Sequence, residues 1–201
     1  MRKLAPLICA CAVVVCGNFA IAQQIDLAVG GSTLFSSKPT SASLAFPPPA
    51  EKGGVYPGAS VDFIRKDRFG LNAEFAYRYK EGLYNGYQRL RPLLYDVNGV
   101  FAPQIDDRTR AELMAGFGGQ SLVFYNRFAP CSPIYSGVCP TSISSTHFLL
   151  HLGAGVRYYF WRRFFARPEA HYYYIVENTD QFHSGNVLRL GASIGYSFGV
   201  K

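Results

Sequence analysis

The sequence predicts an all-β protein: an eight-stranded antiparallel up-and-down transmembrane barrel, preceded by a cleaved signal peptide. Three observations predict it. The 201 residues are only 16% charged but 15% aromatic, with 20 glycines, whereas a soluble domain is about a quarter charged. Apolar residues alternate with small or polar ones, and long connections alternate with short ones. Because no long apolar run follows the N-terminal segment, the pattern excludes a helical membrane protein.

The N-terminal segment has the features of a secretory signal peptide. Arg2 and Lys3 precede a mostly apolar stretch, and Ala20-Ile21-Ala22 forms an A-x-A cleavage site. The predicted division is therefore 1–22 as signal peptide and 23–201 as barrel domain. The alternatives are a membrane-anchoring helix and a lipoprotein signal ending at Cys16. Val15 disfavours the lipoprotein, because a small residue should precede the lipidated cysteine.

Eight segments alternate with a period of two, which is the signature of strands with one apolar face. Three are clear: Phe69–Tyr79, Thr146–Phe160 and Leu188–Phe198. Five are weaker: Gln24–Phe35, Val55–Ile64, Tyr87–Phe101, Arg110–Phe124 and Phe164–Ile175. Each has roughly ten residues or more, the length that a tilted strand needs to cross a bilayer.

The connections support a membrane barrel. Ser36–Gly53 and Tyr125–Ser145 are long, whereas Arg65–Arg68 and Trp161–Arg163 are short. Outer-membrane barrels have short periplasmic turns and longer extracellular loops. A soluble sandwich or lipocalin-like barrel is the alternative, with its apolar face inside. The other face here is rich in Gly, Ala and Ser and nearly lacks Lys, which suits a narrow lumen better than a soluble exterior.

Two cysteines remain after the signal peptide. Cys131 and Cys139 lie in a proline-flanked segment of the third long connection. In an exported protein this spacing predicts a local disulfide. A metal site at this pair is disfavoured, because it would need more ligands than the pair offers.

Two strand motifs carry a family resemblance. With Tyr95–Phe101 before a proline-containing turn and the terminal Arg189–Phe198, the chain resembles the OmpA-like family of small, porin-like outer-membrane β-barrels. The resemblance implies an outer-membrane location, contact with outer-membrane lipids and lipopolysaccharide, and recognition of the last strand by the assembly machinery. Three residues follow Phe198, so that recognition signal is displaced. We expect a monomer.

The polar faces predict a lumenal charge network with five acids and five bases. Its members are Asp62, Glu74, Arg78, Asp96, Arg110, Glu112, Arg157, Arg167, Glu169 and Arg189. Buried charges must be paired or solvated, so paired side chains would fill a barrel of eight strands. Glu112, Arg157, Arg167 and Glu169 are expected to form a salt-bridged plug near the periplasmic end. The alternative is a narrow water-filled channel gated by the same pairs.

No catalytic, cofactor or metal site is predicted. His147 and His151 lie four apart on the inward face of one strand, about 13 Å from each other and too far to share an ion. His183, Ser184 and Glu177 have the residue types of lipid A deacylase barrels, but their spacing is generic and a loop explains them better. Basic residues sit in turns rather than in a continuous stripe, which disfavours a nucleic-acid partner.

The predicted function is a non-enzymatic structural, adhesive or surface-binding role in the cell envelope, through the extracellular loops. The first alternative is a narrow channel or passive carrier for small or apolar solutes. The least favoured is a lipid A-modifying enzyme.

Overall fold

The computed structural model describes residues 24–37, 49–65, 68–86, 88–125 and 142–199. A 3-10 turn, Asn178–Asp180, precedes the last strand. The strands are β1 (Gln24–Ser36), β2 (Tyr56–Arg65), β3 (Phe69–Tyr77), β4 (Gly82–Tyr84), β5 (Gln88–Phe101), β6 (Gln104–Asp106), β7 (Thr109–Tyr125), β8 (Ser142–Trp161), β9 (Phe164–Ile175) and β10 (Asn186–Phe198). Within these residues, no helix has the length and apolar composition of a membrane span.

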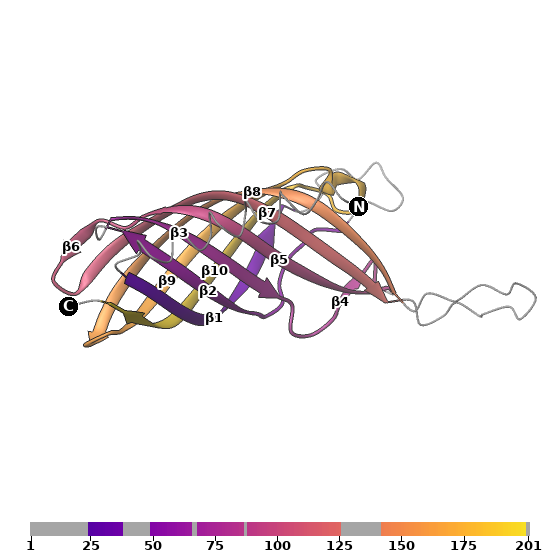
Figure 1. The fold of residues 1–201 in the computed structure, drawn as a ribbon. Helices are drawn as coiled ribbons and strands as arrows, with labels where there is room; N and C mark the ends of the chain where they lie inside the picture. The colour runs from indigo at the N-terminus through magenta and orange to yellow at the C-terminus, as the bar shows by residue number, and fades with distance from the viewer. Residues whose placement is uncertain (1–23, 38–48, 66–67, 87, 126–141, 200–201) are drawn as a thin grey trace, which may run out of the picture.

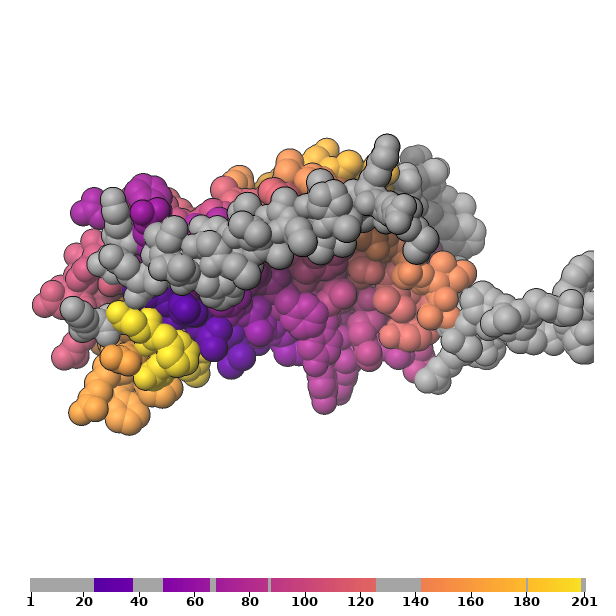
Figure 2. All heavy atoms as spheres, viewed as in Figure 1, coloured from indigo at the N-terminus to yellow at the C-terminus, as the bar shows by residue number. Residues whose placement is uncertain are grey.

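Eight of the strands close into an antiparallel barrel, as predicted (Figure 1). Each long strand pairs with the next long strand along the chain, and β1 pairs with β10 to close the circle. In the space-filling view the indigo of β1 lies beside the yellow of β10 (Figure 2). The short strands β4 and β6 add only to the edges of β5 and β7. Each of the eight strands pairs with a neighbour on both sides, and a closed sheet suits a lipid environment.

The strand boundaries follow the alternating pattern closely, and the largest difference is at the start of β8. The pattern begins β8 at Thr146, but the strand begins at Ser142, where it pairs with the end of β7. The residues Ser142–Ser145 are polar or small apart from Ile143, so they carry no amphipathic alternation. Backbone pairing with β7 nevertheless keeps them extended.

The two ends of the barrel differ. We call the end with the connections 66–68, 102–108 and 162–163 the turn end, and the end with the connections 37–55, 78–87, 126–141 and 176–185 the loop end. Figure 1 shows β6 and the C-terminus at the turn end and β4 at the loop end. The short connections therefore lie at one end of the barrel and the longer ones at the other, as the alternation in the sequence predicts.

The outer surface of the barrel is apolar. Leu152 on β8 exposes 60% of its surface, and Phe117 on β7 and Ile194 on β10 are similarly exposed. Other exposed apolar side chains on the wall are Leu27, Val29, Phe69, Phe75, Val97, Leu113, Phe148, Leu150 and Leu190. A soluble protein rarely exposes a continuous apolar surface of this extent. The arrangement matches the predicted lipid-facing wall.

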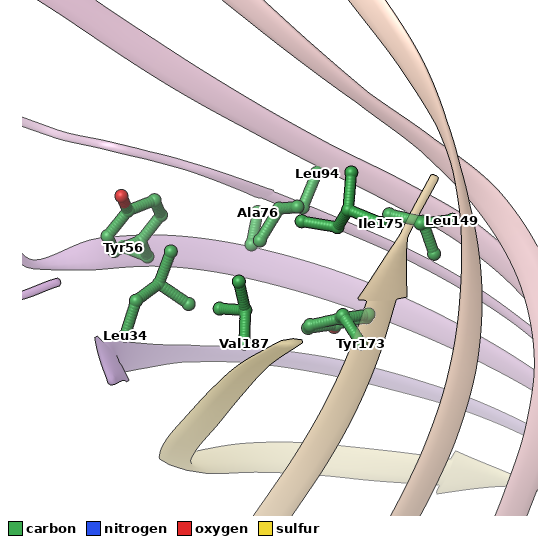
Figure 3. Packing of buried hydrophobic residues seen from close by; sticks show 8 residues of the cluster. All are labelled: Leu34, Tyr56, Ala76, Leu94, Leu149, Tyr173, Ile175 and Val187. Carbon is green, nitrogen blue, oxygen red and sulfur yellow. The ribbon is translucent and has the colours of Figure 1, made fainter. Parts of the chain in front are cut away.

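The interior also contains apolar side chains. A cluster toward the loop end is made of Leu34, Tyr56, Ala76, Leu94, Leu149, Tyr173, Ile175 and Val187, whose side chains point toward one another inside the wall (Figure 3). A second cluster, at the turn end, comprises Ile64, Val100, Ala102 and Met114. Between them lies the polar part of the lumen. The sequence analysis expected small and charged residues there and did not foresee these apolar layers.

Candidate functional site

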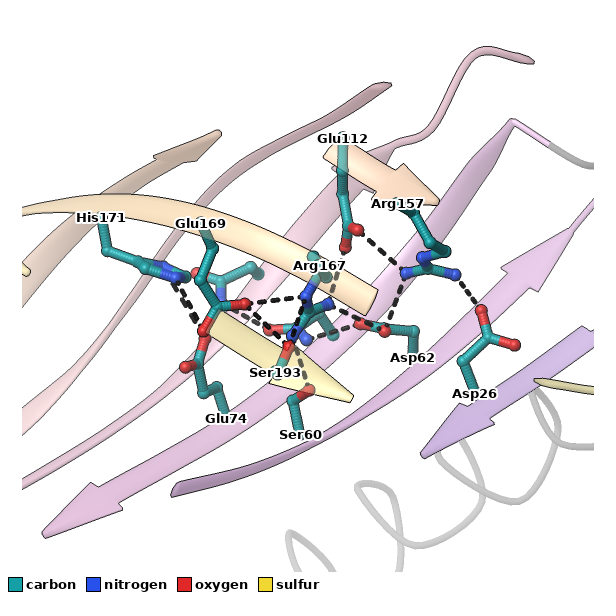
Figure 4. Close-up of polar contacts among 12 residues, drawn as sticks. Asp26, Ser60, Asp62, Glu74, Glu112, Arg157, Arg167, Glu169, His171 and Ser193 are labelled. Atoms are coloured by element: carbon teal, nitrogen blue, oxygen red, sulfur yellow. Dashed lines mark hydrogen bonds and ion pairs between the residues drawn. The ribbon is translucent and has the colours of Figure 1, made fainter. Parts of the chain in front are cut away.

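A network of buried ion pairs fills the lumen between the two apolar clusters (Figure 4). Arg157 on β8 is fully buried, and its guanidinium contacts three carboxylates. One Nη atom donates to Asp26, and the other lies 3.0 Å from Asp62 and 2.9 Å from Glu112. These acids come from β1, β2 and β7, so one side chain joins four strands. The Phe165 ring lies 4.6 Å from the guanidinium carbon.

Arg167 on β9 shares two of those acids. Its Nη1 lies 3.2 Å from Asp62 and 3.1 Å from Glu112, while its Nε lies 2.7 Å from Oε2 of Glu169. The remaining Nη2 donates to the Ser60 hydroxyl at 2.8 Å. Every nitrogen of this guanidinium therefore has at least one acceptor, and a buried arginine needs such partners.

The network continues toward the middle of the barrel through a third arginine and two histidines. Arg189 on β10 binds Oε1 of Glu74. The ring of His171 lies beside both Glu74 and Glu169, and its Nδ1 is 2.9 Å from Nε2 of His151. These two imidazoles come from β9 and β8 and stack with a centroid distance of 5.0 Å.

The second ring nitrogen of His151 is held by β5. Nδ1 of His151 lies 2.6 Å from Oδ1 of Asn98 and 3.2 Å from Oδ1 of Asp96. Asn98 donates in turn to Asn72 at 2.9 Å. The polar contacts thus form one continuous system from β1 around to β10.

Negative charge is in excess in this network. It holds three buried arginines, Arg157, Arg167 and Arg189, against six carboxylates: Asp26, Asp62, Glu74, Asp96, Glu112 and Glu169. A buried charge that lacks a counter-charge is costly. The interior therefore needs further positive charge, either as protons or as a cation.

Most of the sequence-predicted lumenal residues lie in this network. Glu112, Arg157, Arg167 and Glu169, expected to form a plug, are joined directly by ion pairs toward the turn end. Two predicted members lie apart. Arg110 donates to Gln24 at 3.1 Å at the edge of the network. The guanidinium of Arg78 lies at the loop end against Gly54 and Gly82, near Glu51.

Asp26 and the pairing of two histidines in the network were not predicted from the sequence. Asp26 alternates with apolar residues on β1 and was identifiable as inward from that pattern alone. His151 was recognised as inward-facing from the alternation, but its pairing with His171 was not. Their contact depends on the register of β8 against β9, where His171 is opposite Gly153, and no spacing along one strand reveals it.

A separate buried carboxyl lies at the loop end. Glu51 precedes β2 and is 3% exposed, and its Oε1 accepts a hydrogen bond from Gln120 of β7. Burial raises the pKa of Glu51 from 4.5 to about 7, although hydrogen bonds from Gln120 and Asn178 and the charge of Arg78 oppose the rise. This carboxyl therefore titrates near neutral pH.

The side chains of His183, Ser184 and Glu177, which have the residue types of a deacylase site, do not form a catalytic site among the described residues. The Ser184 hydroxyl accepts from the backbone of Asn186, and the His183 backbone donates to Pro49. No hydrogen bond described in this part of the chain links the side chains of His183, Ser184 and Glu177. The predicted disulfide of Cys131 and Cys139 lies outside the described residues.

One small cavity lies beside the ion-pair network. A cavity of about 10 Å³ lies beside Glu74, Glu169 and Arg189, with Gly30 and Gly58 among its lining residues. That is roughly the room for a single water molecule. Two of its lining residues, Glu74 and Glu169, also form a group with His171, in which each side chain offers one ligand-type atom within 4.8 Å of the other two.

Solved structures share this architecture. The N-terminal barrel domain of Pseudomonas aeruginosa OprF superposes with a TM-score of 0.59 at 15% identity, over 88% of this chain and 98% of that one. Ail, the attachment invasion locus protein of Yersinia pestis, gives 0.57 at 14% identity, over 87% and 98%. Neisserial surface protein A gives 0.55 at 15% identity, over 88% and 96%.

The chain therefore has the fold of small outer-membrane β-barrels, which confirms the resemblance drawn from the two strand motifs. No protein-family model matches the chain, and no curated protein matches it.

Proposed function

We propose that the protein is a non-enzymatic, monomeric barrel of the bacterial outer membrane that acts through the connections at its loop end, as a structural, adhesive or surface-binding protein. The filled interior carries this proposal. Apolar clusters and ion pairs occupy the lumen and leave a cavity of about 10 Å³ beside the network. A barrel packed in this way offers its loops, rather than a pore, for interaction.

Two further observations support the proposal. The apolar outer wall suits a lipid environment, with lipid chains and lipopolysaccharide as its neighbours. Among the proteins of similar fold, Ail is by name an attachment and invasion protein, and one structure of it holds the heparin analogue sucrose octasulfate. An adhesive role for this chain is consistent with that likeness.

The location is tested by electrophoresis of separated membrane fractions. We expect the protein in the outer-membrane fraction, as a band that migrates faster unheated than boiled, because a closed barrel resists detergent at room temperature. A chain recovered only from the soluble or inner-membrane fraction would overturn the proposal.

The role of the loops is tested by exchange. Residues 38–48 and 126–141 are replaced, separately and together, by Gly-Ser linkers of equal length. Retention of cells on heparin-coated and uncoated surfaces is then compared at matched amounts of barrel. We expect the exchanges to abolish retention, and a control at the turn end, Arg162→Ser with Arg163→Ser, to keep it. Retention that survives both loop exchanges would contradict an adhesive role.

The channel remains the second candidate, and planar-bilayer recording separates it. We expect no steady conductance from the wild-type barrel, because Arg157 and Arg167 bridge the lumen between opposing acids. A stable open level that Arg167→Met enlarges would favour a gated channel instead.

A further inference from the structure

We propose that the barrel interior binds one divalent transition-metal ion of the Zn²⁺ type, held by Glu74, Glu169 and Nε2 of His171. These residues come from β3 and β9, on opposite parts of the wall. The inference stands apart from the proposed function, since it concerns the lumen and not the loops. Four observations carry it: the protonation of the histidine pair, two free ligand atoms, the spacing between them, and the excess of negative charge.

The hydrogen bonds fix the protons on the histidine pair. Nδ1 of His151 faces the carboxylate of Asp96 at 3.2 Å, so this nitrogen carries a proton. In a neutral His151, Nε2 is then an acceptor, and Nδ1 of His171 must donate to it across 2.9 Å. A neutral His171 consequently turns an unprotonated Nε2 toward Glu169.

That nitrogen has no hydrogen-bond partner among the described residues, and neither does Oε2 of Glu74. Both side chains are more than nine-tenths buried. A lone pair that faces a carboxylate in a buried site requires a cation between them. Either a proton or a metal ion would satisfy the requirement.

The spacing favours the metal ion. Nε2 of His171 and Oε1 of Glu169 are 3.5 Å apart, which is longer than an N–H···O bond. Two ligands bound at roughly 2.1 Å to a tetrahedral zinc ion lie about 3.4 Å from each other. The observed separation is close to that value. Glu74, Glu169 and His171 each offer one ligand-type atom within 4.8 Å of the other two, and Oε2 of Glu74 lies 3.7 Å from Nδ1 of the same His171 ring.

The surrounding residues orient the three ligands. Arg189 binds Oε1 of Glu74 and leaves Oε2 without a hydrogen bond. Arg167 binds Oε2 of Glu169, so Oε1 faces His171 at 3.5 Å and has only a longer contact, 3.9 Å, with Arg189. The chain from His171 through His151 to Asp96 is a hydrogen-bonded support of the kind that metal-binding histidines have. A small cavity is lined by two of the three ligands, Glu74 and Glu169.

The charge of the network also fits. Six buried carboxylates face three arginines, and a divalent ion would neutralise two of the three excess negative charges. Imidazole together with carboxylate oxygens suits zinc and the neighbouring first-row metals. The proposed ion thus supplies positive charge where the protein itself has too little.

The test uses the folded chain in detergent, stripped with a chelator and titrated with Co²⁺ as a visible probe, then with Zn²⁺ in competition. We expect one Co²⁺ per chain with the intense absorption of a four-coordinate site, and its displacement by Zn²⁺. His171→Gln and Glu74→Gln should weaken binding roughly a hundredfold, and His151→Asn about 10- to 100-fold as a support.

His147→Gln and Glu81→Gln, which lie outside the site, are the matched controls and should bind like the wild type. Heat-dependent migration on gels verifies that each variant is folded. If His171→Gln does not fold, the wild-type titration decides alone. A folded wild-type chain that binds no Co²⁺ overturns the proposal in favour of a shared proton. Binding that His147→Gln removes, or that a folded His171→Gln retains, overturns it in favour of a surface site.

Discussion

Single arginines hold the interior together, and their burial sets them apart from arginines on the surface. Arg157 is fully buried and contacts acids on three strands, whereas Arg89 pairs with Glu81 at 3.1 Å with 41% of its own side chain exposed. A buried pair that loses one partner leaves an uncompensated charge, but an exposed pair contributes little. The two arginines therefore differ both in burial and in the number of their carboxylate partners.

We therefore expect Arg157→Met to lower the free energy of unfolding by about 3–5 kcal/mol. Arg89→Met should change it by less than about 1 kcal/mol. Urea unfolding in phospholipid vesicles, followed by the fluorescence of the one tryptophan, Trp161, measures both. Equal losses in the two variants would contradict a network held by Arg157.

Glu51 gives the barrel a pH dependence of known sign. In the folded chain, burial raises the pKa of this carboxyl to about 7, from 4.5. The folded state binds the proton of Glu51 more tightly than the unfolded state does, so protonation stabilises the folded barrel. This stabilisation is complete below pH 4.5 and is lost as the pH rises to about 7. This difference between the pKa values of the unfolded and folded states corresponds to about 3 kcal/mol of unfolding free energy.

The variant Glu51→Gln keeps a polar amide in place but cannot ionise. We expect the wild type to lose about 3 kcal/mol of unfolding free energy relative to Glu51→Gln between pH 4 and pH 8. Urea titrations at a series of pH values measure the difference, which cancels the other titrating groups. A difference that is flat with pH would show that Glu51 is not buried as a neutral acid.

At the scale of the strand, glycines decide which side chains meet across the lumen. Gly116 on β7 is opposite Asn98 of β5 on one side and His151 of β8 on the other. The hydrogen bond between Asn98 and His151 passes over this glycine. A Cβ added there would contact the Val97 carbonyl oxygen and the Asn98 side chain, so a larger residue would separate the two partners.

We expect Gly116→Ala to lower the unfolding free energy by about 1–3 kcal/mol, the usual cost of overpacking. Gly31→Ala is the matched control on β1, because a Cβ added there meets nothing within 4 Å. The same urea titration measures both. If the two alanines behave alike, close packing over β7 is not what requires glycine at 116.

The strands also show what the sequence can and cannot predict. Alternation locates each strand and its two faces, because a one-residue slip would put an apolar face inside. It places Leu149 on the inward face and Leu150 on the outward face of β8, but it does not show that inward apolar residues of different strands pack together. The interior apolar cluster was missed for that reason. Contacts between strands, such as His151 with His171, depend on register and could not be read from any single segment.

At the scale of the whole molecule, the exposed apolar wall is the feature that distinguishes a membrane barrel from a soluble one. The chain shares its fold with the OprF barrel domain, Ail and Neisserial surface protein A at 14–15% sequence identity. A likeness at such identity shows the shared fold and says nothing about the side chains of the lumen.

The central claim, that this wall faces lipid, is tested most directly by placing a charge on it. Leu152 lies midway along β8 and is 60% exposed, and Ile105 in the short strand β6 at the turn end is 65% exposed. Folding free energies into phospholipid vesicles are measured for Leu152→Arg and Ile105→Arg. We predict a loss of about 2–4 kcal/mol at position 152 and at most about 1 kcal/mol at position 105. Equal, negligible losses at both positions would contradict a lipid-facing wall.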